Sequence, residues 1–231
     1  MIATMVPEVT LTALDLDGDV SADWPLLSLD EVERARRFRF DVHRRRYVAG
    51  RAAVRRTLAS VVAADPSELV FDYGEHGRPD LAGHPLISFN LSNSESVGLL
   101  VVSAAGRVGV DVEVVRPDFA DLRVADRFFA PGEIRRLRAL PMAERDHAFF
   151  RCWTRKEALL KAHGAGLTLP LREFEVSFEP GQPAVLIDGG PVLGHDRWQL
   201  YDTSDLVPGC VAAVAVEALP TTPLYSLGGN S

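Results

Sequence analysis

The stretch WTRKEALLK (Trp153–Lys161) does most to predict the fold, because a similar stretch, YVAGRAAVR (Tyr47–Arg55), occurs earlier in the chain. Apolar residues at helical spacing predict helices over Val42–Val62 and Ala143–His163, which contain the two stretches. Each follows a segment rich in Arg and Glu and precedes strand-like segments. This faint internal repeat predicts an α+β fold of two pseudosymmetric halves related by a pseudo-twofold axis.

The register of the repeat aligns Arg51 with Glu157 and Arg55 with Lys161. The halves are predicted to meet near residue 105, which gives an N-terminal half over residues 1–105, a C-terminal half over residues 106–218 and a tail over residues 219–231. The alternative is a chance similarity between two amphipathic helices.

Local patterns predict further elements. Ser28 followed by Glu31 is a capping-box pattern and predicts a helix to about Phe38, and Gly164 is predicted to end the last long helix. The segment Tyr73–His84, with three glycines and a proline, is predicted to be a loop. Helices are also predicted at Phe119–Phe129 and Pro131–Leu140, and strands at Val9–Leu16, Leu86–Leu91, Val97–Val102, Arg107–Val115, Glu173–Phe178, Ala184–Ile187, Trp198–Tyr201 and Cys210–Val216.

The composition excludes several classes of protein. With 47% hydrophobic and 25% charged residues in 231, the chain is not disordered. Its longest apolar runs fall far short of the roughly 20 residues of a membrane helix, and the N-terminus lacks the pattern of a signal peptide. Cys152 and Cys210 are isolated and form no disulfide framework. We therefore expect a cytoplasmic protein.

Carboxylates recur in two predicted elements. In GVDVEVV (Gly109–Val115), Asp111 and Glu113 share one face of a strand, about 7 Å apart along the chain. Such a pair suits Mg²⁺, which one or two carboxylates can hold, although an ordinary half-exposed strand has the same pattern. Glu157 lies on the apolar face of its helix and therefore needs a partner, either Lys161 one turn on or a shared metal.

Cations are distributed unevenly. Of the 25 basic residues only Lys156 and Lys161 are lysines, and both lie in one short segment, which indicates either a chemical reason or chance. The run Arg34–Arg56 contains ten arginines and a single acid, Asp41, so it is either a solvated helix face or a phosphate-binding surface. FNLSNS (Phe89–Ser94) is predicted to be a strand end leading into a loop that binds phosphate or forms an Asx turn.

Taken together, FNLSNS, GVDVE and WTRKEALLKAHGAGL, in this order and spacing, resemble the motifs of the surfactin-type (Sfp-type) 4′-phosphopantetheinyl transferases. The resemblance also covers RRFRFDVHRRRYVAGRAAVR and the Gly-Arg-Pro at 77–79, and so spans most of residues 28–170. The family fold has two pseudosymmetric α+β halves, in agreement with the repeat.

The resemblance implies a Mg²⁺-dependent attack of a carrier-protein serine on the pyrophosphate of coenzyme A, as in holo-[acyl-carrier-protein] synthases, with adenosine 3′,5′-bisphosphate leaving. It implies that Asp111, Glu113 and Glu157 hold the metal. Glu157 or a metal-bound water would take the serine proton, and Lys161 would bind the pyrophosphate. The positions that match coenzyme A-binding positions of the family are Arg34, Arg46, Arg78, Ser92 and Asn93, the last of which replaces the usual histidine.

The implied partners are coenzyme A and apo acyl- or peptidyl-carrier domains, with no nucleic acid or membrane partner, and the implied state is a monomer. Two other functions fit some of the same residues. A noncatalytic module that binds nucleic acid or another anionic partner would use the arginine run, and its binding would weaken steeply with salt. A Mg²⁺-dependent phosphate-ester hydrolase would use the three carboxylates without a carrier protein.

Overall fold

The computed structural model describes residues 4–6, 9–116, 120, 122–164, 166, 169–194 and 197–218, and the tail predicted from residue 219 lies outside this part. The strands are β1 (Thr4–Val6), β2 (Val9–Asp15), β3 (Phe71–Tyr73), β4 (Pro79–Leu81), β5 (Ser88–Ser94), β6 (Val97–Ser103), β7 (Val108–Val114), β8 (Glu175–Val176), β9 (Leu186–Asp188), β10 (Trp198–Asp202) and β11 (Cys210–Glu217). The α-helices are α1 (Leu29–Arg36), α2 (Asp41–Val62), α3 (Leu122–Phe128), α4 (Pro131–Ala139), α5 (Met142–His163) and α6 (Gly190–Leu193).

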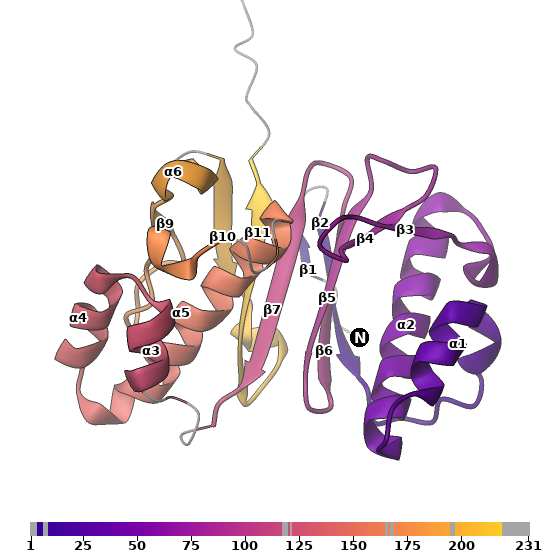
Figure 1. The fold of residues 1–231 in the computed structure, drawn as a ribbon, viewed down its shortest axis with the longest axis horizontal. Helices are drawn as coiled ribbons and strands as arrows, with labels where there is room; N and C mark the ends of the chain where they lie inside the picture. The colour runs from indigo at the N-terminus through magenta and orange to yellow at the C-terminus, as the bar shows by residue number, and fades with distance from the viewer. Residues whose placement is uncertain are drawn as a thin grey trace, which may run out of the picture.

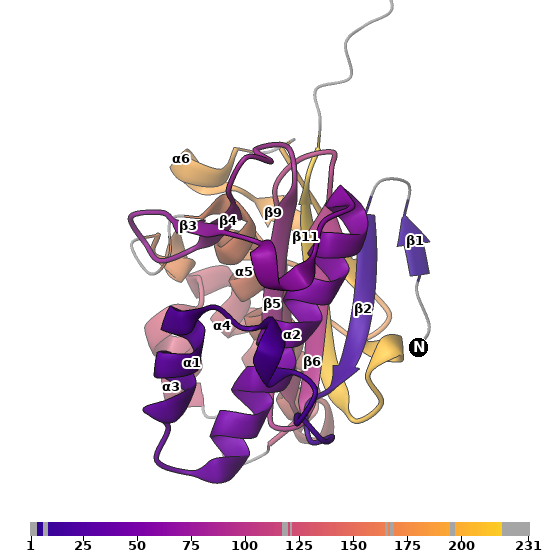
Figure 2. The same cartoon turned by 90° about the vertical axis from the view of Figure 1, so that its right-hand side faces the viewer.

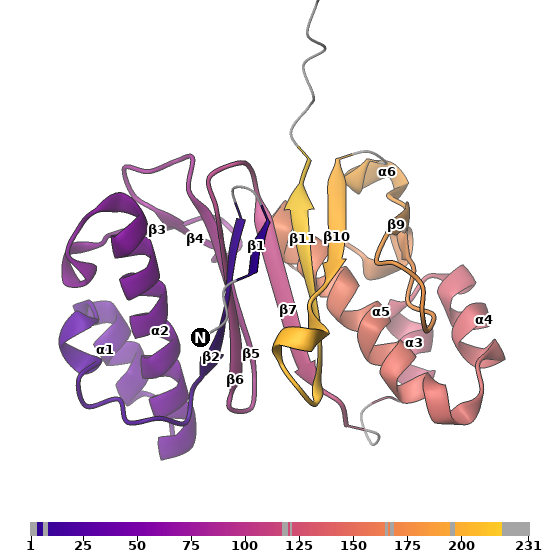
Figure 3. The same ribbon diagram turned by 180° about the vertical axis from the view of Figure 1, so that it is seen from behind.

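Two sheets stand side by side between two groups of helices (Figure 1). One has the strand order β1-β2-β6-β5 and the other β10-β11-β7, all antiparallel. Figure 2 shows β1 at the outer edge of the first sheet, and Figure 3 shows the second sheet in front of α5. The predicted α+β fold with two α/β halves is confirmed.

Alternate faces of the sheets form separate cores. The inner faces pack on each other through an apolar cluster that joins β2 and β6 to β7 and β11; its buried strand residues are Val9, Leu11, Leu99, Val101, Val108, Val110, Val112, Cys210, Ala212 and Val214. The outer faces pack against α2 and α5. The Val residues of β7 thus face the other sheet, which leaves Gly109, Asp111 and Glu113 for the side of α5.

Each half contains a buried ion pair, and the two pairs lie at equivalent positions. Glu31 is the third residue of α1 and Glu133 the third residue of α4. Their partners, Arg55 and Lys156, each lie 14 residues after the first residue of a 22-residue helix. Each cation also donates to two carbonyls at the start and end of a 3₁₀ turn, which are those of Pro66 and Leu69 or of Leu171 and Phe174.

The pseudosymmetry therefore has a different register from the one the sequence predicts. Arg55 is equivalent to Lys156, not to Lys161. The predicted register is wrong because it aligned the charged letters, whereas the buried acid that fixes the true register lies on another helix. Lys156 is fully buried and serves the fold, so a site role accounts for only one of the two clustered lysines.

The Glu31 pair predicts a pH dependence of stability. Burial by itself would raise the pKa of the Glu31 carboxyl, but the charge of Arg51 and a hydrogen bond from Arg55 lower it below its ordinary value. The resulting stabilisation is present above the unfolded pKa, about 4.3, and is lost as the pH falls through the lowered folded value. We expect the urea unfolding midpoint of Glu31→Gln to lie below that of the wild type at about pH 7. The difference between the two midpoints should be smaller at about pH 3. An equal gap at both pH values would contradict this assignment.

Several element predictions change in the structure. The Tyr73–His84 segment is not wholly a loop, because β4 lies within it and pairs with β3. The predicted strand Glu173–Phe178 is shortened to β8, since residues Leu171–Glu173 form a 3₁₀ turn. The predicted helix Phe119–Phe129 is shorter as α3, and Phe119 lies outside the described residues. By contrast, Gly164 caps α5 in the left-handed conformation, as predicted.

FNLSNS is not a strand end followed by a loop, since β5 continues through Ser94. Its alternate side chains face the edge of β7 and accept hydrogen bonds from that strand's backbone. We call these four residues the polar ladder: Ser88, Asn90, Ser92 and Ser94, which accept from the N–H groups of Val108, Val110, Val112 and Val114 over 2.9–3.4 Å. The polar ladder joins the two halves along parallel edge strands.

No helix in the described ranges is long and apolar enough to cross a membrane.

Candidate active site

A glycine on β7 allows α5 to approach the strand closely. A Cβ atom at Gly109 would lie 2.2 Å from the carbonyl oxygen of Ala158 and 2.3 Å from the nitrogen of Ala162, both in the α5 backbone. Such distances are far below any real contact, so only glycine permits this packing. The approach places Lys161 of α5 beside Asp111, two residues after the glycine.

We therefore expect Gly109→Ala to force α5 away from β7, which lowers the melting temperature and displaces Lys161 from Asp111. Overpacking of this kind typically costs about 1–3 kcal/mol of stability or more. Gly18→Ala is the matched control, since nothing lies within 4 Å of its Cβ position. Equal melting temperatures for the two variants would contradict the close packing of α5 on β7.

Asp111, Lys161 and Ser92 form one hydrogen-bonded group. The Lys161 ammonium lies 2.7 Å from Asp111 Oδ1, 2.9 Å from Ser92 Oγ and 3.1 Å from the carbonyl oxygen of Val110. Ser92 donates to the same Asp111 oxygen over 2.9 Å. Asp111 is buried, and its other carboxylate oxygen, Oδ2, has no hydrogen-bond partner although it is shielded from solvent. A buried carboxylate oxygen without a donor is suited to a cation.

Glu113 and Glu157 lie close enough to Asp111 to feel its charge. Burial raises the pKa of Glu157, and the charges of Asp111 and Glu113 raise it further against the opposing charge of Lys161. Burial also raises the pKa of Glu113, and Asp111 adds to this effect, whereas a hydrogen bond from Ser94 lowers it. The three predicted ligands thus form one electrostatic group in which added positive charge relieves repulsion.

These residues fit a hard divalent cation but do not form a complete cage. Within the residues that the structure describes, no three His, Cys, Asp or Glu side chains are close enough together to hold a metal as they stand. Mg²⁺ needs no such cage, because it usually takes one or two carboxylates and completes its shell with water and substrate phosphates. The unpartnered oxygen of Asp111 and the all-oxygen donor set match that preference.

A pocket beside this group adjoins an arginine-lined cavity. The smaller pocket, about 280 Å³, is lined by Glu157, Lys161 and Arg78 among others. It shares three wall residues, Gly77, Pro79 and Asn90, with a cavity of about 550 Å³ between α1, α2 and β5. The basic and acidic side chains lining the larger cavity are Arg34, Arg46, Arg51, His43 and Glu95. This excess of cations suits a ligand that carries several phosphates.

The structure distributes the predicted phosphate-binding residues unevenly. Arg34, Arg46 and Asn93 line the larger cavity, as a shared ligand would require. Arg46 is bound through two hydrogen bonds to Asp17, and the Arg34 guanidinium lies over the Tyr47 ring. A ligand phosphate would compete with these contacts.

Arg78 and Ser92 lie elsewhere. Arg78 donates to the carbonyls of Lys161 and Ala162 at the end of α5 and to Ser88 Oγ, so its guanidinium fixes the helix terminus where the carbonyls carry partial negative charge. Ser92 is buried against Asp111 and Lys161. The sequence motifs include Arg51 in the arginine run and Ser94 in FNLSNS without singling out either residue, and they do not single out His43. The alternation of polar residues in β5 is the signal that could have identified Ser94.

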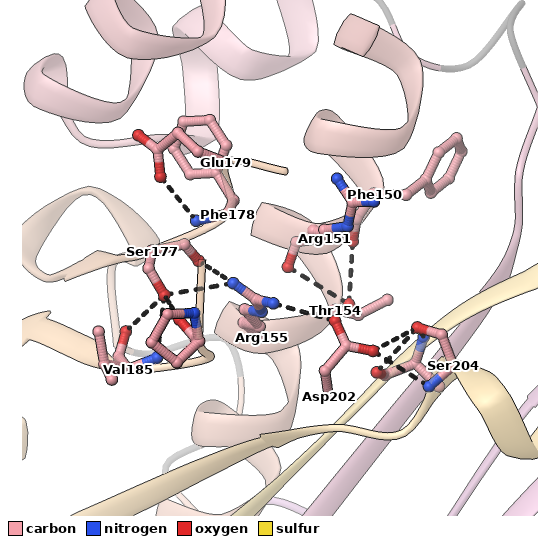
Figure 4. A network of polar contacts seen from close by, with 12 residues as sticks. Phe150, Arg151, Thr154, Arg155, Ser177, Phe178, Glu179, Val185, Asp202 and Ser204 are labelled. Carbon is pink, nitrogen blue, oxygen red and sulfur yellow. Dashed lines mark hydrogen bonds and ion pairs between the residues drawn. The ribbon is translucent and has the colours of Figure 1, made fainter. Parts of the chain in front are cut away.

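A separate network holds α5 against the second sheet. Arg155 of α5 donates to the carbonyl and hydroxyl oxygens of Ser177 and forms an ion pair with Asp202 of β10 (Figure 4). Asp202 in turn accepts from Ser204. Arg155 is almost fully buried, so this network fixes the rotation of α5 about its axis and with it the face that carries Glu157 and Lys161.

One buried and two partly buried carboxylates and an ammonium group beside an arginine-lined cavity suit group transfer involving phosphates. Comparison with known proteins agrees. Residues 107–210 match the family model of the 4′-phosphopantetheinyl transferase superfamily. The chain is 40% identical to the 4′-phosphopantetheinyl transferase HetI of Nostoc sp. over 94% of its own length and 91% of that protein.

Two Bacillus proteins are also similar. The 4′-phosphopantetheinyl transferase psf-1 of Bacillus pumilus is 33% identical over 82% of this chain and 78% of its own length. The 4′-phosphopantetheinyl transferase Sfp of Bacillus subtilis is 32% identical over 69% of this chain and 70% of its own length. The chain belongs to the 4′-phosphopantetheinyl transferase superfamily and is an enzyme of the Sfp and HetI type, which confirms the family predicted from its motifs.

Proposed function

We propose that this enzyme transfers the 4′-phosphopantetheine group of coenzyme A to a serine of an apo acyl- or peptidyl-carrier protein, with Mg²⁺ bound and adenosine 3′,5′-bisphosphate released. The observation that carries the proposal is the group formed by Asp111 and Lys161, with Glu113 and Glu157 beside it, next to a pocket that adjoins the arginine-lined cavity.

Asp111, Glu113 and Glu157 would hold the metal. Bound Mg²⁺ would supply Lewis-acid polarisation of the pyrophosphate and neutralise charge. Its binding would also reduce the mutual repulsion of the three carboxylates, which adds to burial in raising the pKa values of Glu113 and Glu157.

The protein residues would divide the remaining work. The carrier serine oxygen bonds to the phosphorus that bears pantetheine, while the bond from that phosphorus to the bisphosphate oxygen breaks. Glu157, which lines the smaller pocket together with Lys161, takes the serine proton as a general base. The positive charge of Lys161 binds the pyrophosphate and stabilises the negative charge that develops on the leaving bisphosphate.

The arginine-lined cavity would bind the phosphate groups of coenzyme A. Arg34 and Arg46 supply guanidinium groups there, and Asn93, exposed on β5, supplies an amide. Arg78 would act at the narrow junction beside Lys161, where it already fixes the end of α5. The cavity and the carboxylates lie apart, so the reacting pyrophosphate of bound coenzyme A would lie between them.

The test is the intact mass of an apo-carrier protein after incubation with the enzyme, coenzyme A and Mg²⁺. We expect a phosphopantetheine adduct that is absent when a chelator removes Mg²⁺. Free phosphopantetheine without an adduct on any of several carriers would establish the hydrolase instead. Nucleic acid binding that survives loss of the Asp111 charge, again without an adduct, would establish the binding module.

Lys161→Arg is expected to impair transfer although it keeps the charge. The three donors of the ammonium match three oxygens around it, those of Asp111, Ser92 and Val110. A planar guanidinium is larger and cannot meet this arrangement. A displacement of about 1 Å can cost about 100-fold in rate, so we expect a loss of roughly 10- to 100-fold in kcat/KM. Kinetic constants equal to those of the wild type would show that any cation serves at this position.

A further inference from the structure

The polar ladder also contacts the carboxylates of β7. Ser94 Oγ accepts a hydrogen bond from the backbone nitrogen of Val114 over 3.1 Å and lies 2.8 Å from Glu113 Oε2. A hydroxyl has one hydrogen, and an N–H group can only donate. The Ser94 hydrogen is therefore directed at Glu113, and the buried serine holds that carboxylate in one orientation.

Ser92 acts on Asp111 by the same logic. Its oxygen accepts from Lys161 Nζ and from the backbone nitrogen of Val112, so its single hydrogen is directed at Asp111 Oδ1. Two hydroxyls spaced two residues apart on β5 thus match two carboxylates spaced two residues apart on β7. The N-terminal half supplies the donors, and the C-terminal half supplies the acceptors.

We propose that Ser94 is a positioning residue that orients Glu113 for metal binding across the seam between the two halves. This inference rests on the proposed metal-binding role of Glu113. The hydrogen bond counteracts the tendency of Glu113 to turn away from the like charge of Asp111, and partners that orient metal ligands in this way are typically worth about 10- to 100-fold in metal affinity.

Substitution of Ser88 is a control that distinguishes the orientation of a carboxylate from general stabilisation of the contact between β5 and β7. It accepts from the backbone nitrogen of Val108 over 3.1 Å, the same length as the bond from Val114 to Ser94. Its other contact is Arg78, which donates to it over 2.7 Å. Ser88→Ala thus removes an equivalent rung of the polar ladder without touching a carboxylate.

The experiment measures binding of Mn²⁺ alone, a divalent ion that favours oxygen ligands, by the loss of the free-ion paramagnetic resonance signal, together with thermal melting. We expect Ser94→Ala to weaken Mn²⁺ binding by about 10- to 100-fold. Ser94→Thr keeps the hydroxyl and should bind Mn²⁺ as the wild type does. Ser88→Ala should lower the melting temperature by a similar amount while leaving Mn²⁺ affinity unchanged.

The controls distinguish the two ways of failing. If Asp111→Asn loses Mn²⁺ while Ser94→Ala binds it as the wild type does, the positioning role is wrong and the metal site stands. If Ser88→Ala weakens Mn²⁺ binding as much as Ser94→Ala, the hydrogen bonds between β5 and β7 affect the metal site only by stabilising the contact between the two halves. That outcome also overturns the inference. If the wild type and Asp111→Asn bind Mn²⁺ equally, or neither binds it, the proposed metal site itself fails.

Discussion

Asp111→Asn is expected to abolish measurable phosphopantetheine transfer while the protein stays folded. The change keeps the size of the side chain and an oxygen that can accept from Lys161 and Ser92, so the hydrogen bonds around it can persist. It removes the charge next to the unpartnered buried oxygen, which is the feature best suited to a cation. Lewis-acid stabilisation by a metal is worth several kcal/mol, so a loss of at least about 100-fold in kcat/KM follows.

The measurement compares transfer rates over a Mg²⁺ titration with melting curves of the same samples. Glu144→Gln is a control, because it makes the same carboxyl-to-amide change at the exposed start of α5. It lies 17 residues before Lys161 in the chain, about 25 Å along the helix. Turnover in Asp111→Asn like that of this control, at low Mg²⁺, would show that Asp111 is not a metal ligand.

The sequence predicted the elements that bring the acidic group together, because period-2 and helical spacing act locally. The strand pattern placed Asp111 and Glu113 on one face, and Val108, Val110 and Val112 do pack on the other. Motif spacing also identified the family. What the spacing could not supply was the packing distance of α5 from β7, which depends on Gly109.

The polar ladder was missed for a physical reason. Ser and Asn in Phe89–Ser94 favour turns when they are judged alone, since their side chains compete for nearby backbone groups. In the fold, the backbone groups that they satisfy belong to β7, 20 residues further along, whose edge faces β5. Only tertiary structure shows that a polar strand face is complementary to a neighbouring strand edge.

The arginine run had the same limitation. The run predicts one surface, yet Arg55 is buried beside Glu31 and is not part of the cavity lining. Arg46 does line the cavity but is paired with Asp17. Their acidic partners precede the run in the sequence and carry no local signal of pairing.

Lys156→Met is expected to destabilise the fold strongly. Lys156 and Glu133 are both fully buried, with Nζ 2.8 Å from the carboxylate, and Lys156 also donates to the carbonyls of Leu171 and Phe174. Removing one partner of such a pair leaves a buried charge uncompensated, which costs about 3–5 kcal/mol. At roughly 2–4 °C per kcal/mol for a chain of this size, the melting temperature should fall by about 6–20 °C.

The equivalent substitution in the first half, Arg55→Met, should cost less, because Glu31 keeps an ion pair with Arg51. Adding Glu133→Gln to Lys156→Met should restore part of the lost stability, since it removes the uncompensated charge itself. The measurement is urea unfolding of the wild type, Arg55→Met, Lys156→Met, Glu133→Gln and the double variant. If the double variant is less stable than Lys156→Met by the full cost of Glu133→Gln alone, the two side chains do not act as a pair, and the lysine is retained at this position for its packing against the Phe174 ring, 4.2 Å away.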